Sequence, residues 1–502
     1  LTAIDSPTEI TIKLHQPLIA GFALGQQFQL LAQAGEPIKI TGHDSPSQLR
    51  LAKPLPPNTP LNQAIEITFD VEVPILAARI ATGTPADQAL PPMVMHLATT
   101  RGTNALLEEK GAEVTLFITR GFEDLLIISD QKRPDLFALN VQKQGPLTAN
   151  TIGIDERLDA LGQVLRPLNL PAADPPKNEN QSAAVVCLHS HRNPEHEQRL
   201  AKHLRDAGWQ HVSVSSDLAA VIKVLPRAET TVVDAYLSPI MSRYLDGVER
   251  ELGNGKLRVM TSAGGLVARA DYQAKDSLLS GPAGGVVGAA MVGRQTGFER
   301  IIGFDMGGTS TDVCRHDGDF DYKYEHRVGR ARVIAPVLAI ETVAAGGGSI
   351  CGFNGDELFV GPESAGANPG PACYGAGGPL TITDVNLLLG RLDPAQFGIP
   401  LNINAAQSSL DQVLQSIPEP PPEQDLLSGF LDIANERMAD AVRKISIREG
   451  YDPSDYALVA FGGAGGQHAC AIAEKLGVST VLCPSDAGLL SARGLREAVM
   501  ER

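Results

Sequence analysis

The sequence is poor in aromatic residues and has none of the paired cysteines that mark zinc sites. Phe, Trp and Tyr make up 5% of the 502 residues, with a single Trp, which argues against a surface that stacks on sugar rings or bases. The six cysteines are scattered and form no Cys-x-x-Cys pair. We therefore expect no zinc framework, and the cysteine usage is typical of a reducing, cytoplasmic compartment.

Long apolar runs and an excess of positive charge are also missing. No unbroken apolar stretch is long enough to span a bilayer. The 42 Lys and Arg residues are outnumbered by 58 Asp and Glu residues, which gives a formal net charge of −16. A protein that binds nucleic-acid backbones or anionic lipids needs the opposite sign, so neither nucleic acid nor a membrane is an expected partner.

The pattern of apolar residues predicts an α/β protein with a β-rich start. Residues 1–70 alternate apolar and polar side chains, as in Glu9–Leu14, and predict a small β-rich subdomain. From about residue 71, strands alternate with helices, which favours parallel sheets. We predict a first α/β lobe at 71–299 and a second at 300–502. The predicted strands include 94–97, 114–118, 183–188 and 211–214, and the predicted helices include 104–110, 194–207, 281–294 and 426–449.

The most informative stretch is an Asp-x-Gly-Gly-Thr-x-Thr-Asp run that follows the apolar strand Ile301–Phe304. Glycines let backbone N–H groups face an anion, hydroxyls add donors, and two carboxylates can hold Mg²⁺. This combination predicts a site for a nucleotide phosphate tail, although a Gly- and Thr-rich β-hairpin turn has the same composition. The candidate phosphate ligands are Gly307, Gly308, Thr309, Ser310 and Thr311, and the candidate catalytic carboxylates are Asp305, also the candidate metal ligand, and Asp312.

A second glycine loop lies between the strand 457–460 and a predicted helix at 469–476. Bare backbone beside a helix N-terminus suits an anion or a flat ring. The loop is no Walker P-loop, because no Lys-Ser/Thr pair follows it. Two such units suggest the split nucleotide cleft of actin and of the acetate and sugar kinases, with ATP as ligand. The candidate residues are Gly462, Gly463, Gly465, Gly466 and His468, the last of which could instead cap its helix.

A third run, Gly346–Gly348, follows the predicted strand 338–343. Three consecutive glycines carry an entropic cost that close approach of either a ligand or another backbone would justify. At the end of the strand 94–97, the polar run from Thr99 to Asn104 opens a helix, and ligands favour such strand ends. Thr100, Arg101 and Asn104 are therefore candidate substrate residues. Arg101 and Arg133 could pair with a substrate carboxylate, or simply form surface salt bridges.

These same residues resemble the hydantoinase A / 5-oxoprolinase family, which also occurs as one subunit of acetone-type carboxylases. The resemblance runs in order from about Val71 to Arg502, and the runs 259–265 and 486–492 are closest to 5-oxoprolinase. The matching motifs are 97–108, 119–124, 133–137, 188–194, 235–239, 280–285, 303–313, 345–350, 369–375 and 461–469.

The resemblance implies an actin-like, two-lobed ATPase that uses ATP and Mg²⁺ to phosphorylate the oxygen of a ring amide. A companion hydantoinase B-like hydrolase module or subunit then opens the ring, which for 5-oxoproline yields glutamate, ADP and phosphate. We expect a small cyclic amide as substrate and an oligomeric assembly. A hydantoinase, an acetone-type carboxylase subunit, a sugar kinase and a non-catalytic binding subunit are the alternatives.

The sequence departs from the family pattern at its start. The family opens with a first Asp-x-Gly-Gly-Thr-Phe-Thr-Asp loop, the other half of the phosphate site, and this sequence has none. The hydrolase module that follows in full-length 5-oxoprolinases is also missing. We therefore expect an internal fragment or the product of a split gene, with weakened ATP binding.

Overall fold

The computed structural model of the protein divides by its internal contacts into two compact units. The first unit comprises Leu1–Leu97, Ser238–Val259 and Ala268–Asp271, and the second comprises Ala98–Leu237, Met260–Val267 and Tyr272–Arg502. The division into 1–70, 71–299 and 300–502 remains a prediction. The structure describes residues 1–14, 18–30, 36–57, 59–61, 65–132, 137, 139–140, 145–172, 175–176 and 178–501.

The first unit begins with a sheet in the strand order β1-β2-β5-β4-β3-β6. Its inward side chains, such as Ile10, Phe28 and Ile40, form a separate apolar core. Further along, β7 pairs in parallel with β14, with Val94 opposite Lys256. Its elements are β1 (Ala3–Ser6), β2 (Glu9–Thr11), β3 (Gln27–Leu30), β4 (Ile38–Ser45), β5 (Gln48–Leu51), β6 (Ile65–Thr68), α1 (Val73–Thr82), β7 (Val94–Leu97), β14 (Lys256–Met260) and the end of α6 (Val224–Leu252).

The second unit contains a four-stranded parallel sheet in the order β13-β12-β8-β9. The expected βαβ order is confirmed, because β12 and β13 are parallel and α4 lies between them in the chain. The elements of this part are α2 (Arg101–Leu107), β8 (Glu113–Thr119), α3 (Leu125–Ile128), β9 (Thr148–Ile154), β10 (Arg157–Leu158), β11 (Val164–Arg166), β12 (Gln181–Val186), α4 (Glu195–Asp206), β13 (Val212–Val214) and α5 (Ser215–Leu218).

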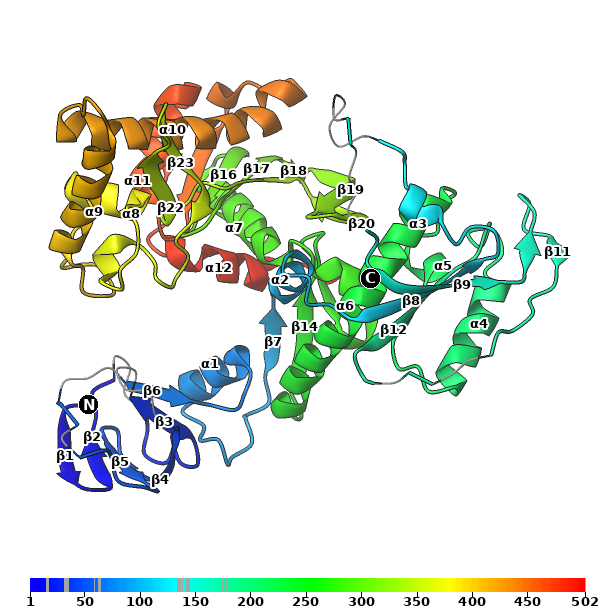
Figure 1. Ribbon diagram of the computed structural model, residues 1–502, viewed down its shortest axis with the longest axis horizontal. Coiled ribbons are helices and arrows are strands. Elements are labelled where there is room, and N and C mark those ends of the chain that lie inside the picture. The colour runs from blue at the N-terminus through cyan, green and yellow to red at the C-terminus, as the bar shows by residue number, and fades with distance from the viewer. Residues whose placement is uncertain are drawn as a thin grey trace. The chain divides into compact units, whose positions relative to one another are not determined.

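The rest of the second unit is built on a mixed sheet in the order β18-β17-β16-β24-β25, with β21 also paired to β17. Strands β16, β17 and β18 lie side by side in Figure 1. Its elements are β15 (Leu266–Ala268), α7 (Ser280–Thr296), β16 (Arg300–Met306), β17 (Thr311–Asp317), β18 (Asp319–Phe320), β19 (Tyr322–Val328), β20 (Ala331–Leu338), β21 (Ile340–Val343), β22 (Ser349–Phe353), β23 (Leu358–Ser364), α8 (Ile382–Leu388), α9 (Ile403–Ser416), α10 (Glu423–Ile445), β24 (Ala457–Phe461), α11 (Gly465–Leu476), β25 (Val481–Leu482) and α12 (Leu490–Glu497).

The two faces of this sheet are covered by different helices. Ile302 and Phe304 belong to a large core with residues of α10 and α11. Ile301 packs instead with Ala289 of α7, and a Cβ on Gly303 would lie 3.2 Å from the Cβ of Ala289. Because side chains alternate along a strand, odd-numbered positions of β16 face α7 and even-numbered positions face α10 and α11.

Several helix boundaries differ from the prediction at their capped ends. The helix predicted at 104–110 is Arg101–Leu107, and its N-cap is Thr100. The helix predicted at 194–207 starts at Glu195, so Pro194 is the N-cap. Asn193 still satisfies the helix start, since its Oδ1 accepts from the Glu195 N–H at 3.0 Å. In the part of the chain that the structure describes, every helix is too short or too polar to cross a membrane.

Candidate phosphate site

The Asp305 run forms a β-hairpin whose two carboxylates are direct cross-strand partners. Strands β16 and β17 pair antiparallel, with Asp305 opposite Asp312 and Met306 opposite Thr311. The Gly307 N–H closes the turn by donating to the Ser310 carbonyl at 3.0 Å. Opposed residues in an antiparallel pair project to the same side of the sheet. Both carboxylates therefore stand together on the face that α7 covers.

Burial and mutual repulsion leave this carboxylate pair poorly stabilised as a dianion. Burial, reinforced by the charge of Asp312, raises the pKa of Asp305 to about 6. Burial also raises the pKa of Asp312, against the opposing effect of the Thr342 hydroxyl, which donates to Asp312 Oδ1 at 2.5 Å. Within the described ranges, no Lys, Arg or His forms an ion pair with either carboxylate. A cation is the natural complement to such a pair.

The donor set suits Mg²⁺, which shares its coordination shell with water and phosphate, better than it suits a metal whose ligands are all protein side chains. The described residues contain no group of three His, Cys, Asp or Glu side chains placed to hold a metal. Mg²⁺ commonly takes one or two carboxylates and completes its shell with water and substrate phosphates. Asp305 and Asp312 supply that number of carboxylates, so they would hold Mg²⁺ together with a phosphate ligand.

The tip of the hairpin carries backbone donors that the fold does not use. Gly308 and Thr309 are exposed, and a Cβ on Gly308 would meet nothing within 4 Å. The amides of Gly308, Thr309 and Ser310 donate no hydrogen bond to any residue that the structure describes. Consecutive free N–H groups in a turn form an anion-binding concavity.

The Gly346–Gly348 run supports the hairpin from behind. The Gly347 and Gly348 N–H groups donate to the carbonyls of Gly307 and Gly308 at 3.0 and 2.6 Å, and the Gly346 N–H donates to Ser349 Oγ at 2.9 Å. A Cβ on Gly346 would lie 2.7 Å from the Thr309 carbonyl carbon. Of the two explanations for these glycines, close approach of another backbone is the one observed. Ligand contact by Gly346, Gly347 and Gly348 remains a prediction.

The second glycine loop reaches the same edge of the sheet, because β24 runs parallel to β16 with Phe461 opposite Asp305. A Cβ on Gly462 would lie 2.3 Å from Asp305 Oδ1, and its φ of +79° also favours glycine. The Ala464 N–H donates to the Met306 carbonyl at 3.0 Å. Helix α11 begins at Gly465, four residues before the predicted start, and has no side-chain cap. The N–H groups of its first turn remain suited to an anion.

Gly463 and Gly466 leave open space on this loop. A Cβ on either residue would meet nothing within 4 Å, and both residues are exposed. The nucleotide contacts predicted for Gly463 and Gly466 are compatible with this placement and remain predictions, as do those predicted for Gly462 and for the buried Gly465.

His468 lies inside the protein rather than on the loop surface. Its side chain is fully buried, and its two ring nitrogens lie 2.7 Å from Asn435 Oδ1 and 3.1 Å from Asn386 Nδ2. Burial lowers its pKa to about 4, so the ring is neutral at neutral pH. Because Asn435 Oδ1 can only accept, His468 Nδ1 carries the proton. With both nitrogens engaged, His468 supports α11 from within.

Thr311 also faces inward, unlike the other hydroxyls of the hairpin. Its side chain is fully buried, and its Oγ1 donates to the Ala345 carbonyl at 2.6 Å. It thereby joins β17 to the residue that precedes the Gly346 run. Thr309 and Ser310 retain at least partial exposure, so they are the hydroxyls placed to reach a ligand.

Helix α7 connects the hairpin to the predicted substrate residues. A Cβ on Gly285 would lie 2.9 Å from the Phe461 ring, and one on Gly293 would lie 2.7 Å from Ile301. The helix therefore runs antiparallel to β16, with its N-terminus beyond the edge at which β16 and β24 end. We call this edge, with its glycine loops, the carboxyl edge.

The start of α2 lies beside the first turn of α7. Ser280 Oγ donates to the Thr99 carbonyl at 3.0 Å, and a Cβ on Gly281 would lie 3.1 Å from Thr100 Cγ2. Thr100, Arg101 and Asn104 are exposed there, on the same side of the unit as the carboxyl edge. The other predicted carboxylate partner, Arg133, lies outside the described residues.

Sequence reasoning missed the residues that hold the site from behind. Thr342 on β21 binds Asp312, and Asn435 on α10 fixes the tautomer of His468. Thr383 Oγ1 donates to the Gly347 carbonyl at 2.8 Å. All three come from segments distant in sequence, and a lone Thr or Asn in an amphipathic element carries no local signal of such a role.

Comparison with protein-family models gives two consecutive matches. Residues 78–208 match the hydantoinase/oxoprolinase N-terminal region, and residues 227–502 match the hydantoinase/oxoprolinase model itself. The second match covers more than half of the chain. The chain therefore belongs to the hydantoinase/oxoprolinase family.

Individual relatives agree with this assignment. The 5-oxoprolinase PfmaA of Pestalotiopsis fici is 40% identical over 454 residues, which cover 81% of this chain and 35% of the relative. The caprolactamase subunit alpha of Pseudomonas jessenii is 36% identical over 420 residues, covering 79% of this chain and 60% of the relative. This chain thus spans about a third of the length of the 5-oxoprolinase that it matches.

A solved structure shows the same mixed α/β fold. The ATP-dependent caprolactamase from Pseudomonas jessenii is 32% identical, with a TM-score of 0.69, and the match covers 87% of this chain and 67% of that one. The predicted α/β class is confirmed in this coarser form, as a hydantoinase-type fold. The actin-like, two-lobed arrangement remains a prediction.

Proposed function

We propose that the carboxyl edge binds the phosphate tail of ATP, in the manner of the actin-like ATPases. The observation that supports this most strongly is that one hairpin carries both carboxylates without a cationic partner and backbone amides without a hydrogen-bond acceptor. Asp305 and Asp312 lack a cationic partner among the described residues, and the amides of Gly308, Thr309 and Ser310 lack acceptors there. Phosphates accompanied by Mg²⁺ satisfy both groups at once.

Each part of the edge then has a distinct task. Asp305 and Asp312 hold Mg²⁺, and the hairpin amides with Thr309 and Ser310 orient phosphate oxygens. The open surface at Gly463 and Gly466 admits the adenosine portion against the N-terminus of α11. Gly346–Gly348, Thr311 and His468 hold these groups rigidly, which matters because phosphoryl transfer depends on positioning and charge neutralisation.

We further propose that this site activates the carbonyl of a cyclic amide for hydrolytic ring opening, with 5-oxoproline as the first substrate to test and glutamate as its product. An unactivated lactam is a poor electrophile, and ATP would supply the phosphoryl group that makes its C–N bond cleavable. Thr100, Arg101 and Asn104 would orient the lactam, with Arg101 toward its carboxylate. Family membership and the ATP-dependent caprolactamase support this reading.

The partners follow from the same reading. Ring opening needs a hydrolase, which we propose is a hydantoinase B-like module or subunit, and the subunit nomenclature of the caprolactamase relative supports an assembly of that kind. An oligomeric state and a cytoplasmic location are parts of the same proposal.

The experiment that tests the function is an ATPase assay of the assembly with and without lactam. We expect 5-oxoproline to stimulate ATP hydrolysis and Asp305→Asn to abolish the stimulated rate. Caprolactam, which has no carboxylate, serves as the matched substrate for Arg101→Gln. The variant should lose turnover of 5-oxoproline and leave any turnover of caprolactam unchanged. ATP hydrolysis that ignores both lactams would refute the proposal.

A further inference from the structure

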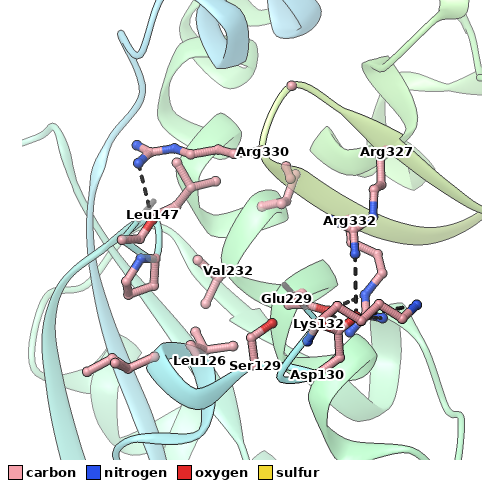
Figure 2. A pocket seen from close by; sticks show the side chains of 16 residues that line it. Leu126, Ser129, Asp130, Lys132, Leu147, Glu229, Val232, Arg327, Arg330 and Arg332 are labelled. Atoms are coloured by element: carbon pink, nitrogen blue, oxygen red, sulfur yellow. Dashed lines mark hydrogen bonds and ion pairs between the residues drawn. The ribbon is translucent and has the colours of Figure 1, made fainter. Parts of the chain in front are cut away.

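A cavity of about 700 Å³ lies in the second unit, apart from the carboxyl edge (Figure 2). Four segments form its wall: the end of α3 with the residues after it, the segment before β9, the start of α6, and the turn between β19 and β20. The described lining residues are Leu126, Ile127, Ser129, Asp130, Lys132, Gly145, Pro146, Leu147, Glu229, Val232, Val233, Arg327, Gly329, Arg330, Ala331 and Arg332. None of them belongs to the hairpin or to the glycine loops.

The charged side of this cavity has more cations than carboxylates. Figure 2 shows Arg327, Arg332 and Lys132 gathered around Asp130. Asp130 Oδ2 lies 3.7 Å from both Lys132 Nζ and Arg327 Nη2, and 3.9 Å from Arg332 Nη1. Although buried, this oxygen accepts no hydrogen bond in the described structure. Three cations thus surround one carboxylate oxygen at ion-pair distance, without donating to it.

The remaining contacts account for part of this charge. Arg332 is bound tightly by Glu229, both groups being largely buried. Arg330 donates through Nη1 to the Gly145 carbonyl at 3.2 Å, while its buried Nε has no acceptor in the described structure. Glu109, 3.5 Å from Arg330 Nη2, and Glu325, 3.6 Å from Arg332 Nη1, are 59% and 57% exposed, so water screens both pairs. Among the lining residues, four cations face two carboxylates, which leaves a surplus of positive charge.

The opposite side of the cavity is apolar. Leu126, Leu147 and Val232 extend side chains toward it from α3, from the segment before β9, and from α6 (Figure 2). A concave site with an apolar wall and a few convergent polar groups is the usual form of a small-molecule site, and its volume lies within the range for such sites.

We propose that this cavity binds a small organic carboxylate with an apolar body. The carboxylate lies against Arg330, whose guanidinium group retains donors, while Arg327 adds positive charge across the cavity, and the body lies on Leu126, Leu147 and Val232. An anion without an apolar part, such as phosphate, would leave the apolar wall of the cavity in contact with water. A neutral amide leaves the surplus charge uncompensated. The site is independent of the nucleotide proposal, because the two share no residue.

Titration calorimetry with the full chain at low ionic strength tests this site, using hexanoate as the probe. Hexanamide removes the charge, acetate removes the body, and inorganic phosphate supplies charge alone. We expect hexanoate to bind at least about tenfold more tightly than hexanamide, acetate or phosphate. Either a charged hydrogen bond or several buried methylene groups contributes a difference in affinity of about that size. Equal affinity for hexanoate and any one of the three, or no binding of hexanoate, would overturn the proposal.

Variants locate the binding. Arg330→Gln should weaken hexanoate binding about tenfold, and Arg327→Gln, at a side chain 57% exposed, should weaken it without affecting the fold. Arg199→Gln removes the same charge from the exposed face of α4, and it should leave the affinity unchanged. Loss of binding in Arg199→Gln, or full binding in both pocket variants, would place the anion elsewhere.

Discussion

Asp305 and Asp312 stand opposite each other in one antiparallel hairpin, and the charge of Asp312 contributes to the raised pKa of Asp305. Two partly buried carboxylates side by side oppose folding when both are ionised. Such an arrangement is typical of functional sites, where local stability is sacrificed for a charge that a ligand needs. Substitutions at residues proposed to bind Mg-ATP should therefore act differently from substitutions at residues that only hold the carboxyl edge in place.

Replacement of Asp305 by Asn should change how thermal stability depends on pH. The native pKa of Asp305, about 6, lies above its unfolded value of 3.8. The native state therefore binds this proton more tightly, and the contribution of Asp305 to the stability of the wild-type protein should fall by up to about 3 kcal/mol as pH rises from about 4 to about 6. Asp305→Asn should remove much of that loss. Melting profiles of both proteins would be measured at pH 4.5 and pH 7.5 without divalent cations. Profiles that are the same for the two proteins at both pH values would contradict this prediction.

Addition of Mg²⁺ at pH 7.5 should raise the melting temperature of the wild-type protein more than that of Asp305→Asn. Binding to the native carboxylate pair stabilises the folded state by mass action. Asp271→Asn removes a carboxylate from an exposed position of the first unit, so it serves as the matched control for non-specific screening. This control should keep the full wild-type shift. An equal shift in the two Asp variants would show that Mg²⁺ acts elsewhere.

Removal of the Asp305 carboxylate should abolish ATP turnover and leave cooperative folding intact. Loss of one preorganised electrostatic group commonly lowers a rate by a factor on the order of 10²–10³. The measurement is steady-state ATP hydrolysis by Asp305→Ala in the presence of lactam. Wild-type turnover in this variant would remove the hairpin from the mechanism.

Two neighbouring glycines should respond differently to substitution. Gly463→Val adds a branched side chain where a Cβ meets nothing, so the protein should fold normally but require more ATP for half-maximal rate. Gly462→Ala places a methyl group 2.3 Å from Asp305 Oδ1 in a backbone conformation with φ of +79°, so it should lower the melting temperature itself. An unchanged ATP requirement in Gly463→Val would place the nucleotide away from this loop.

His468→Gln should act on stability rather than on ATP affinity. The substitution breaks the paired contacts to Asn435 and Asn386, and each buried group left unsatisfied costs roughly 1–3 kcal/mol. The contribution of His468 to wild-type stability should fall as pH falls from about 6.5 to about 4, because the unfolded histidine takes up a proton before the buried one does. That part of the acid sensitivity should disappear in the variant. A raised KM for ATP without destabilisation would favour direct nucleotide contact instead.

Local sequence was sufficient for the elements that carry the site. An apolar run followed by Asp and two glycines predicted the β16 strand and its turn, and the small-residue helix expected at 281–294 is Ser280–Thr296. Such features depend on neighbouring residues, so the chain itself records them. The helix predicted to begin at Ala469 begins at Gly465 because its first turn is fixed by packing against β16, which outweighs the weak helix propensity of glycine.

Contacts between residues far apart in the sequence decide which partners Gly346 and His468 meet, and local sequence could not predict these contacts. Whether Gly346 meets a ligand or a backbone depends on the hairpin at Thr309, and whether His468 faces a nucleotide depends on Asn435 of α10. Neither partner is close in sequence. The orientation of α7, which brings Thr100 to the same side as the hairpin, is likewise a property of packing between helix and sheet.

The most direct test of the nucleotide proposal is hydrogen–deuterium exchange of the chain with and without saturating Mg-ATP. The account predicts slower exchange in two separate stretches, 303–313 and 461–468, where the free amides of Gly308, Thr309 and Gly466 would gain acceptors. Gly347 and Gly348 already donate within the protein and should change little. Protection confined to other segments, or no protection at any ATP concentration, would contradict the account.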